Sequence, residues 1–308
     1  MTRRLLAQKI AIAGFGFALF VSSGASFYDS RHLAEPVVLG PGVTAVKQLA
    51  DYFAPLRGTA NDCHVYVLDG RQPGATMLVL GGSHPEEPAG RLVAWIVAEN
   101  AVVQQGRLIV VPSANRSATT VTRVGGAYPP DFSIETSWGK RTFRMGDRWA
   151  NPLDQWPDPF TFVHYPSKQN LAYQDSRNLN RTFPGRPDGN LTERTSYAVS
   201  EMIRREKIDM TIDLHEASLG YPVVSTYVCH QRADEMCMMP SMILSAGQFP
   251  MKTEVSPKSL RGLTHREIGD FTDSFAVLME SPEPFIEKFA GPMTEDLMLN
   301  GRDEFLQT

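Results

Sequence analysis

The sequence predicts a doubly wound α/β fold, because short β-type runs alternate with segments of helical spacing. Several of these runs are almost continuously apolar, which is expected of strands covered on both faces. The predicted strands are Val65–Leu68, Thr76–Leu80, Leu108–Val111, Met210–Leu214, Val223–Val228 and Phe275–Met279. The predicted helices are Glu87–Glu99, Thr192–Glu206 and Ala233–Gly247.

The composition is that of an ordinary globular protein. Of the 308 residues, 42% are hydrophobic and 21% are charged, values in the usual range. The formal net charge is −4 and the pI is about 6.0, so there is no basic surplus of the kind that nucleic acids attract. We therefore expect no nucleic-acid partner.

The N-terminal segment differs from the rest and predicts an export signal at residues 1–25. A basic start precedes the apolar run Ile10–Val21, and the small residues Ser23 and Ala25 suit cleavage by signal peptidase. Arg3-Arg4 before two leucines also resembles a twin-arginine signal, which would export a folded protein. The prediction is a periplasmic or secreted protein.

The same segment has a second interpretation as an uncleaved membrane anchor. The run Ile10–Val21 is shorter than the roughly 20 residues that an ordinary membrane-spanning helix needs. Cleavage is therefore favoured, and we expect no stable membrane span after the leader is removed. Residues 26–308 would then form a single catalytic domain with a long loop insertion around 114–175.

That insertion is rich in Pro, aromatic and charged residues and has no sustained periodicity. Loops this long are uncommon in compact domains unless they are functional or disordered. Its many aromatic residues argue against disorder, and we expect short strands that wall an active site. The alternative is a structural insertion that covers a sheet edge.

Three polar residues at strand ends predict a metal site. His84 and Glu87 follow Thr76–Leu80 after a Gly-Gly turn, and His215 directly follows the strand Met210–Leu214. Parallel strands place ligand-binding residues at their carboxyl ends. Two imidazoles and one carboxylate leave a fourth position open, which is typical of catalytic rather than structural zinc. Asp213 shares a strand face with His215, so it is expected near the metal site, either to hold a ligating imidazole or to have a structural role.

Two further segments complete the candidate site. The run from Arg177 through Asn180 and Arg181 to Gly185 places guanidinium groups beside amide donors, a combination that suits a carboxylate. Glu280 ends a very apolar strand, where a carboxyl group tends to have a raised pKa and can transfer protons. The cysteines Cys63, Cys229 and Cys237 form no CxxC pair, and whether Cys229 bridges Cys237 stays open.

In chain order, HxxE, NR-x-FPG, DLH and a strand-end Glu resemble the zinc carboxypeptidase superfamily. The phrase GGSHPEEPAG, residues 81–90, is most similar to the succinylglutamate desuccinylase/aspartoacylase branch. The resemblance covers roughly residues 65–282. It implies a three-layer α/β/α architecture with a mixed, mostly parallel central sheet.

The resemblance also implies residue roles and a reaction. His84, Glu87 and His215 match the ligands of one Zn²⁺ per chain. Glu280 matches the general base that deprotonates the attacking water and later protonates the leaving amine. The pair that holds the substrate carboxylate is matched by Asn180 and Arg181, and Arg177 is the candidate to polarise the scissile carbonyl. Its rivals are Arg141, Arg144 and Arg148.

The expected function is hydrolysis of an amide bond in a small molecule or peptide that carries a free carboxylate. An N-acyl amino acid is the first choice, and a peptide, including a cell-wall peptide, is the alternative. A non-catalytic zinc or carboxylate-binding module is the alternative from a different class. The sequence departs from the family at Pro85 and Asn178, and the 28 residues after Glu280 are too few for the C-terminal β domain of aspartoacylase. Its narrow specificity is therefore not transferred.

Overall fold

The computed structural model describes residues 3–35, 37–121, 130–218, 221–247 and 249–283. The chain divides into two compact units, Met1–Glu35 and Pro36–Thr308. The first consists of the helix α1, Arg3–His32, whose span Arg3–Asp29 is long and apolar enough to cross a membrane. A signal sequence passes the same test, so length and composition do not separate the two interpretations of this segment.

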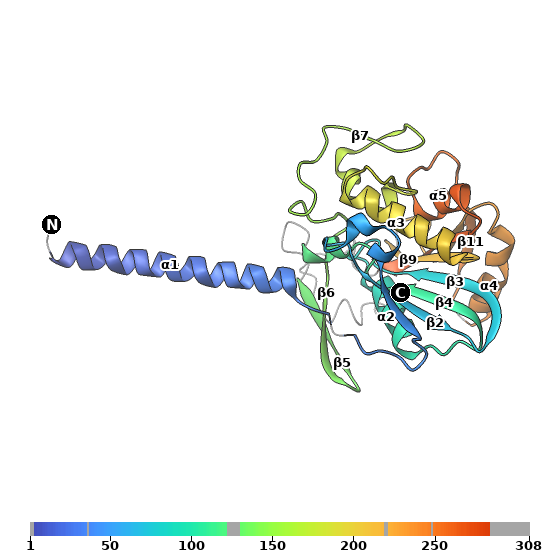
Figure 1. Cartoon of the computed structure of the whole chain (residues 1–308), viewed down its shortest axis with the longest axis horizontal. Helices are drawn as coiled ribbons and strands as arrows, with labels where there is room; N and C mark the ends of the chain where they lie inside the picture. The colour runs from blue at the N-terminus through green and yellow to red at the C-terminus, as the bar shows by residue number, and fades with distance from the viewer. Residues whose placement is uncertain (1–2, 36, 122–129, 219–220, 248, 284–308) are drawn as a thin grey trace. The chain divides into compact units, whose positions relative to one another are not determined.

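The second unit is built on an eight-stranded mixed sheet with the strand order β1-β2-β4-β3-β9-β12-β10-β11 (Figure 1). The four central strands β4, β3, β9 and β12 run parallel to one another. β2 pairs antiparallel with β1 and β4, whereas β10 pairs antiparallel with β12 and parallel with β11. The strands are β1 Ala45–Gln48, β2 His64–Asp69, β3 Gln72–Leu80, β4 Gln105–Val111, β9 Met210–Ser218, β10 Thr226–Cys229, β11 Lys252–Val255 and β12 Phe275–Glu283.

Helices cover both faces of the sheet, which confirms the predicted three-layer architecture. In β3, Leu78 and Leu80 face a core that also contains residues of α3 and α5, while Val79 faces a core shared with α2. A third cluster joins α4 to the face that carries Ile212 and Met279, which is the α2 face because Ile212 pairs with Val79. The helices are α2 Pro88–Asn100, α3 Leu191–Glu206, α4 Asp234–Ala246 and α5 Thr264–Phe271.

Most of the predicted elements are present, with a few differences. The predicted strand Val223–Val228 begins later, at Thr226, because the residues before it form a turn. The strands β1 and β11 and the helix α5 were not predicted. Their sequences are short and polar: β11 is a mostly exposed edge strand, and α5 buries Arg266 and Glu267 in place of apolar residues.

The segment 114–175 contains two short hairpins, β5 Asp131–Thr136 with β6 Gly139–Arg144, and β7 Phe162–Val163 with β8 Asn170–Leu171. The first hairpin is joined to α2 by a buried ion pair in which Arg141 donates to Glu99 at 2.5 and 2.8 Å. The 3-10 turns η4 Tyr173–Arg177 and η5 Leu179–Arg181 follow and lead toward α3. The described part of the segment is thus joined to the α/β layers by this ion pair and by backbone hydrogen bonds such as that from Ala114 N–H to the carbonyl of Gly81 at 2.9 Å.

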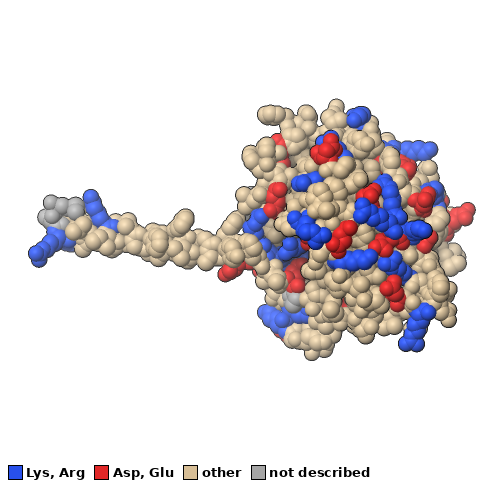
Figure 2. All heavy atoms as spheres, viewed as in Figure 1, with Lys and Arg blue, Asp and Glu red and all other residues tan. Residues whose placement is uncertain are grey.

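Acidic and basic side chains are intermingled on the visible face of the second unit (Figure 2). Mixed charge of this kind offers no single-sign field to a polyanion. In α1, by contrast, the stretch between Lys9 and Asp29 carries no Asp, Glu, Lys or Arg. The expectation that the protein has no nucleic-acid partner remains a prediction.

Candidate metal centre and active site

The first two candidate ligands lie in the turn that connects β3 to α2. Gly82 adopts φ +68°, a left-handed conformation that glycine reaches without strain. The N–H of Glu87 donates to the carbonyl of His84 at 3.1 Å, which closes the turn. Glu87 is thus the residue that immediately precedes the first turn of α2.

His215 lies on β9, next to this turn. A Cβ on Gly90 would lie 2.5 Å from the carbonyl oxygen of Leu214, so only glycine lets α2 approach β9 this closely. Near the start of the helix, Ala89 N–H donates to the carboxylate of Glu216 at 2.7 Å. First-turn amides have no partner within their own helix, and here one of them joins α2 to the strand end that carries His215.

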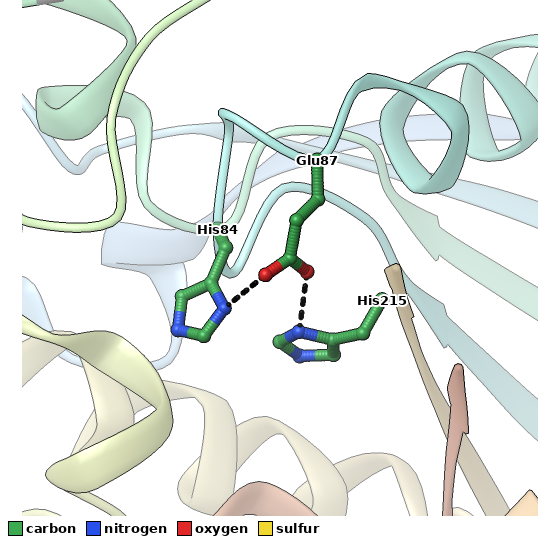
Figure 3. Close-up of side chains that lie close together, drawn as sticks. All are labelled: His84, Glu87 and His215. Atoms are coloured by element: carbon green, nitrogen blue, oxygen red, sulfur yellow. Dashed lines mark hydrogen bonds and ion pairs between the residues drawn. The ribbon is translucent and has the colours of Figure 1, made fainter. Parts of the chain in front are cut away.

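The three predicted ligands converge. The candidate ligand atoms of His84, Glu87 and His215 lie within 4.8 Å of one another, and all three side chains are buried. Figure 3 shows the Glu87 carboxylate between the two rings, with Oε1 2.7 Å from His84 Nδ1 and Oε2 2.8 Å from His215 Nδ1. Both histidines therefore present the same nitrogen to one shared point.

The outer nitrogen of each ring lies close to a second residue. His84 Nε2 lies 2.8 Å from the amide oxygen of Asn178, and His215 Nε2 lies 3.0 Å from Asp213 Oδ2. An amide oxygen only accepts, so His84 carries a proton on Nε2 and turns the Nδ1 lone pair toward Glu87. Such outer partners typically fix the tautomer of a metal-binding histidine.

This donor set fits a metal ion. Two imidazole nitrogens and a carboxylate oxygen are common ligands of zinc, with three protein ligands in its catalytic sites. A lone pair of His84 that faces a carboxylate oxygen is repulsive unless a proton or a cation lies between them. The described residues therefore form a site that could hold a metal ion, and Asp213 lies near it, as expected.

The charges within the cluster follow from its burial. Burial raises the pKa of Glu87, but the two histidines act more strongly together and bring it well below its usual value. Burial lowers the pKa of His84. It also lowers that of His215, yet Asp213 and Glu87 outweigh it and leave that pKa well above the usual value. The cluster thus keeps a carboxylate ionised in a buried position.

Glu280 lies beside His215 because their Cα atoms are paired in the β9–β12 register. Its Oε2 is buried and accepts no hydrogen bond from the residues that the structure describes. Burial is the main cause that raises the pKa of Glu280 to about 7. The raised value agrees with the sequence prediction, and a carboxylate of this kind is suited to exchange protons near neutral pH.

Asn180 and Arg181 lie in the turn η5, directly after Asn178. The amide oxygen of Asn178 accepts from the backbone N–H of Asn180 at 3.0 Å as well as from His84. The Asn180 side-chain oxygen accepts from the N–H of Thr264 at 2.8 Å. The charge of Glu87 acts on the Arg181 guanidinium, whose pKa burial lowers. The pair expected to bind a carboxylate is therefore linked to the metal cluster through Asn178, which contacts both His84 and the backbone of Asn180.

Arg177 is paired with residues outside this cluster. Its Nε donates to Asp158 at 2.9 and 3.1 Å, and its Nη1 donates to the carbonyl of Ala150 at 2.9 Å. The role in polarising the scissile carbonyl that the sequence suggested for Arg177 stays a prediction. Asp158, 19 residues away, gave no sequence signal of this pairing.

Arg148, one of the three rivals, is the arginine in contact with the cluster. Its Nε donates to Glu86 at 2.9 Å and its Nη2 donates to Glu87 at 3.2 Å. Another rival, Arg141, is paired with Glu99. Glu86, directly before Glu87, is fully buried, and a buried carboxylate needs a partner, which Arg148 supplies. Sequence reasoning used Glu87 and passed over Glu86.

Part of the chain matches a known family of catalytic domains. Residues 160–276 match the succinylglutamate desuccinylase/aspartoacylase catalytic domain. The chain is 26% identical over 165 residues to N-alpha-acetyl-L-2,4-diaminobutyric acid deacetylase of Halomonas elongata. That alignment covers 52% of this chain and 34% of the relative, so the chain spans about a third of the curated protein that it matches.

Solved structures of the same kind resemble the chain at lower identity. The product-bound ectoine utilization protein EutE (DoeB) from Ruegeria pomeroyi is 21% identical, with a TM-score of 0.43 over 71% of this chain and 52% of the other. A metallo-carboxypeptidase from Burkholderia cenocepacia is 14% identical, with a TM-score of 0.46 over 84% and 59%. The domain match at residues 160–276 agrees with the resemblance that the sequence predicts, to the succinylglutamate desuccinylase/aspartoacylase branch of the zinc carboxypeptidase superfamily.

Proposed function

We propose that the protein is a zinc-dependent hydrolase that cleaves the amide bond of an N-acyl amino acid with a free carboxylate. The observation that carries the proposal is the buried cluster of His84, Glu87 and His215 with Glu280 beside it. The deacetylase relative from Halomonas elongata, which by its name acts on an N-acetylated amino acid, supports this substrate class.

The three ligands would hold one Zn²⁺ per chain. Bound there, zinc would supply Lewis-acid polarisation of the scissile carbonyl and lower the pKa of water toward about 7. The chain's own part is to fix the ligand geometry: Asn178 and Asp213 lie close to the outer nitrogens of the two rings. Such fixed geometry favours a site that is ready before the substrate arrives.

Glu280 takes the proton of the attacking water at its carboxylate and returns it to the nitrogen of the leaving amine. Asn180 and Arg181 bind the substrate carboxylate and so place the amide bond next to Glu280. We assign the stabilisation of the developing oxyanion to Arg148, because its guanidinium contacts both Glu86 and Glu87, whereas Arg177 is paired with Asp158.

The test is the isosteric change Glu280→Gln in the zinc-loaded protein. It keeps the shape of the side chain and removes its ability to accept a proton, so kcat for an N-acyl amino acid should fall by about 10²- to 10⁴-fold. Zinc content, measured by elemental analysis, should stay that of the wild type. Unchanged turnover in Glu280→Gln would refute Glu280 as the base.

A peptide is the second candidate substrate, and the exposed aromatic side chains of the segment 114–175 favour it. Trp156 and Phe160 are 76% and 104% exposed, so the segment offers apolar surface for a longer ligand. Parallel assays with N-acetyl amino acids and with cell-wall peptides discriminate the two. Hydrolysis of neither, with zinc bound, would favour a non-catalytic zinc or carboxylate-binding module instead.

We also propose that α1 directs export and that the catalytic unit acts in the periplasm or outside the cell. The support is the exposed apolar helix at the N-terminus behind a basic start. The test is fractionation of cells that express the full chain, with N-terminal sequencing of the product. A product found only in the cytoplasm, with its first residues intact, would overturn this proposal.

A further inference from the structure

We propose that Thr264 is a positioning residue for both halves of the site. Its hydroxyl group orients the metal ligand His215 through Asp213, and its backbone N–H orients the side-chain amide of the substrate-binding Asn180. The inference rests on the proposed function and deepens it. Thr264 is the first residue of α5, is fully buried, and lies between the strand end of β9 and the turn η5. Its hydroxyl and its backbone N–H each have a separate target.

The hydroxyl acts on the metal side. Thr264 Oγ1 lies 2.6 Å from Asp213 Oδ2 and 3.1 Å from Asn180 Oδ1, both of which are acceptors. One hydroxyl proton cannot serve both, and the shorter contact to a carboxylate is the stronger one. The proton therefore goes to Asp213, whose other oxygen accepts from Ser83 at 2.8 Å.

Asp213 passes this constraint to His215. With both its oxygens held, the carboxylate keeps one orientation, and Oδ2 lies 3.0 Å from His215 Nε2. The negative charge of Asp213 beside Nε2 favours the imidazole proton on that nitrogen, which leaves the Nδ1 lone pair for the metal position beside Glu87. Loss of such an outer partner typically weakens metal binding by about 10- to 100-fold.

The backbone N–H acts on the substrate side. The first amides of a helix have no acceptor within the helix, and the N–H of Thr264 donates to Asn180 Oδ1 at 2.8 Å. With its oxygen occupied, Asn180 presents its NH₂ group outward as a donor. A carboxylate needs a donor at that point, so the helix start decides which end of the amide faces the substrate.

Two substitutions separate the two groups. Thr264→Val removes the hydroxyl but keeps the N–H. Thr264→Pro removes both, and proline is well tolerated at the first helical position. The preceding Leu263, at φ −81° and ψ 143°, already has the extended conformation that a following proline requires. Thr264→Ser keeps both groups and is the conservative rescue.

The matched control is Thr195→Val. Thr195 is also fully buried and uses its hydroxyl twice, donating to the Leu191 carbonyl at 2.8 Å and accepting from Asn61 at 3.0 Å, but it lies on α3 away from the cluster. Thermal unfolding of every variant measures loss of stability. A stability change common to both Val variants is thereby separated from an effect on the site.

Zinc affinity is measured with the metal alone, by competition with a chromophoric chelator. We expect Thr264→Val to bind Zn²⁺ about 10- to 100-fold more weakly, and Thr264→Ser and Thr195→Val to stay within about threefold of the wild type. At saturating zinc, Thr264→Pro should raise KM for an N-acetyl amino acid roughly tenfold beyond Thr264→Val, with binding calorimetry of the same compound as a second measure.

Zinc binding by Thr264→Val equal to that of Thr195→Val would overturn the proposal, and so would equal KM values in Thr264→Val and Thr264→Pro. If the proline variant does not fold, the Val and Ser variants alone decide it. Failure of the proposed function is distinguishable: the wild type would then hydrolyse no substrate, while the zinc affinities and the calorimetry would still test Thr264.

Discussion

The two halves of the candidate site are positioned in different ways. The strand-end half, His84, Glu87, His215 and Glu280, belongs to the ends of β3, β9 and β12 or to the turn that follows, and sheet register sets its spacing. The loop half, Arg148, Asn180 and Arg181, lies in irregular backbone, and side-chain contacts with buried partners hold it.

The two halves should therefore respond differently when a neighbouring side chain is substituted. A strand-end residue keeps its place when a neighbouring side chain changes, because its backbone is part of the sheet. A loop residue depends on its partner: Arg148 is paired with Glu86, whereas Arg177 is paired with Asp158. Substitutions in the two halves should therefore have different effects.

The largest effect is expected from Glu87→Ala in the strand-end half. The change removes a ligand and the group that both histidines face, so zinc affinity should fall by more than the 10- to 100-fold typical of losing an outer partner, and turnover should be lost. Chelator competition and zinc analysis after dialysis measure it, with Glu201→Ala on α3 as the control. A zinc content of one per chain at unchanged affinity would show that the strand-end half is not the metal site.

In the loop half, Arg148→Ala should lower kcat by about 10²- to 10³-fold, the usual cost of losing one oxyanion donor. Arg177→Ala should leave kcat within about threefold but lower the melting temperature, because Asp158 loses its partner. Steady-state kinetics and thermal unfolding of both variants measure this. The reverse ranking of kcat would return the role to Arg177.

Arg181→Ala is expected to act on binding more than on turnover. A hydrogen bond to a charged group contributes about 1.5–3 kcal/mol, which corresponds to a roughly 10- to 150-fold rise in KM for a substrate with a carboxylate. The matched comparison is an N-acetyl amino acid against its amide. If KM rises by the same factor for the acid and for its amide, Arg181 does not bind the substrate carboxylate.

The smallest effect concerns stability and pH. Burial raises the pKa of Glu216 from 4.5 to about 8, so the folded protein keeps a proton that the unfolded chain releases above pH 4.5. This contribution to stability is full below pH 4.5 and is lost by up to about 1.4 kcal/mol per pH unit as the pH rises toward 8.

Glu216→Gln cannot ionise and should flatten that dependence, while its amide oxygen can still accept from Ala89. Denaturant unfolding of both proteins between pH 5 and 8 in the presence of a chelator measures the difference. Parallel stability curves for the two proteins would contradict the assignment to Glu216.

The strand-end half was predictable because local patterns carry it. Apolar runs followed by a glycine turn or by DLH indicate strand ends, and strand ends of a parallel sheet meet at one edge. The loop half was only partly predictable. Its motif indicated Asn180 and Arg181, but for the role of polarising the scissile carbonyl three arginines of an aperiodic segment were alternatives to Arg177. Which arginine lies at the cluster depends on its contacts with Glu86 or Asp158, and these contacts form only when the chain folds.

Elements that depend on buried polar contacts, such as α5, gave little signal in the sequence. α5 is eight residues long and buries Arg266 and Glu267, so it is shorter than the window of about 11–18 residues over which helical periodicity can be recognised. Its first residue, Thr264, consequently gave no sequence signal, although it contacts both Asp213 and Asn180. Buried polar contacts of this kind are fixed by tertiary structure.

The separation of the ligands along the chain has a consequence for folding kinetics. Glu87 and His215 are 128 residues apart, and they meet only once the β3–β9 pairing has formed. Closing so long a loop is slow, because its entropic cost precedes any gain from the contact. High-affinity capture of a metal ion during refolding would therefore report completion of the central sheet, and a chelating dye could time that event in a single refolding experiment.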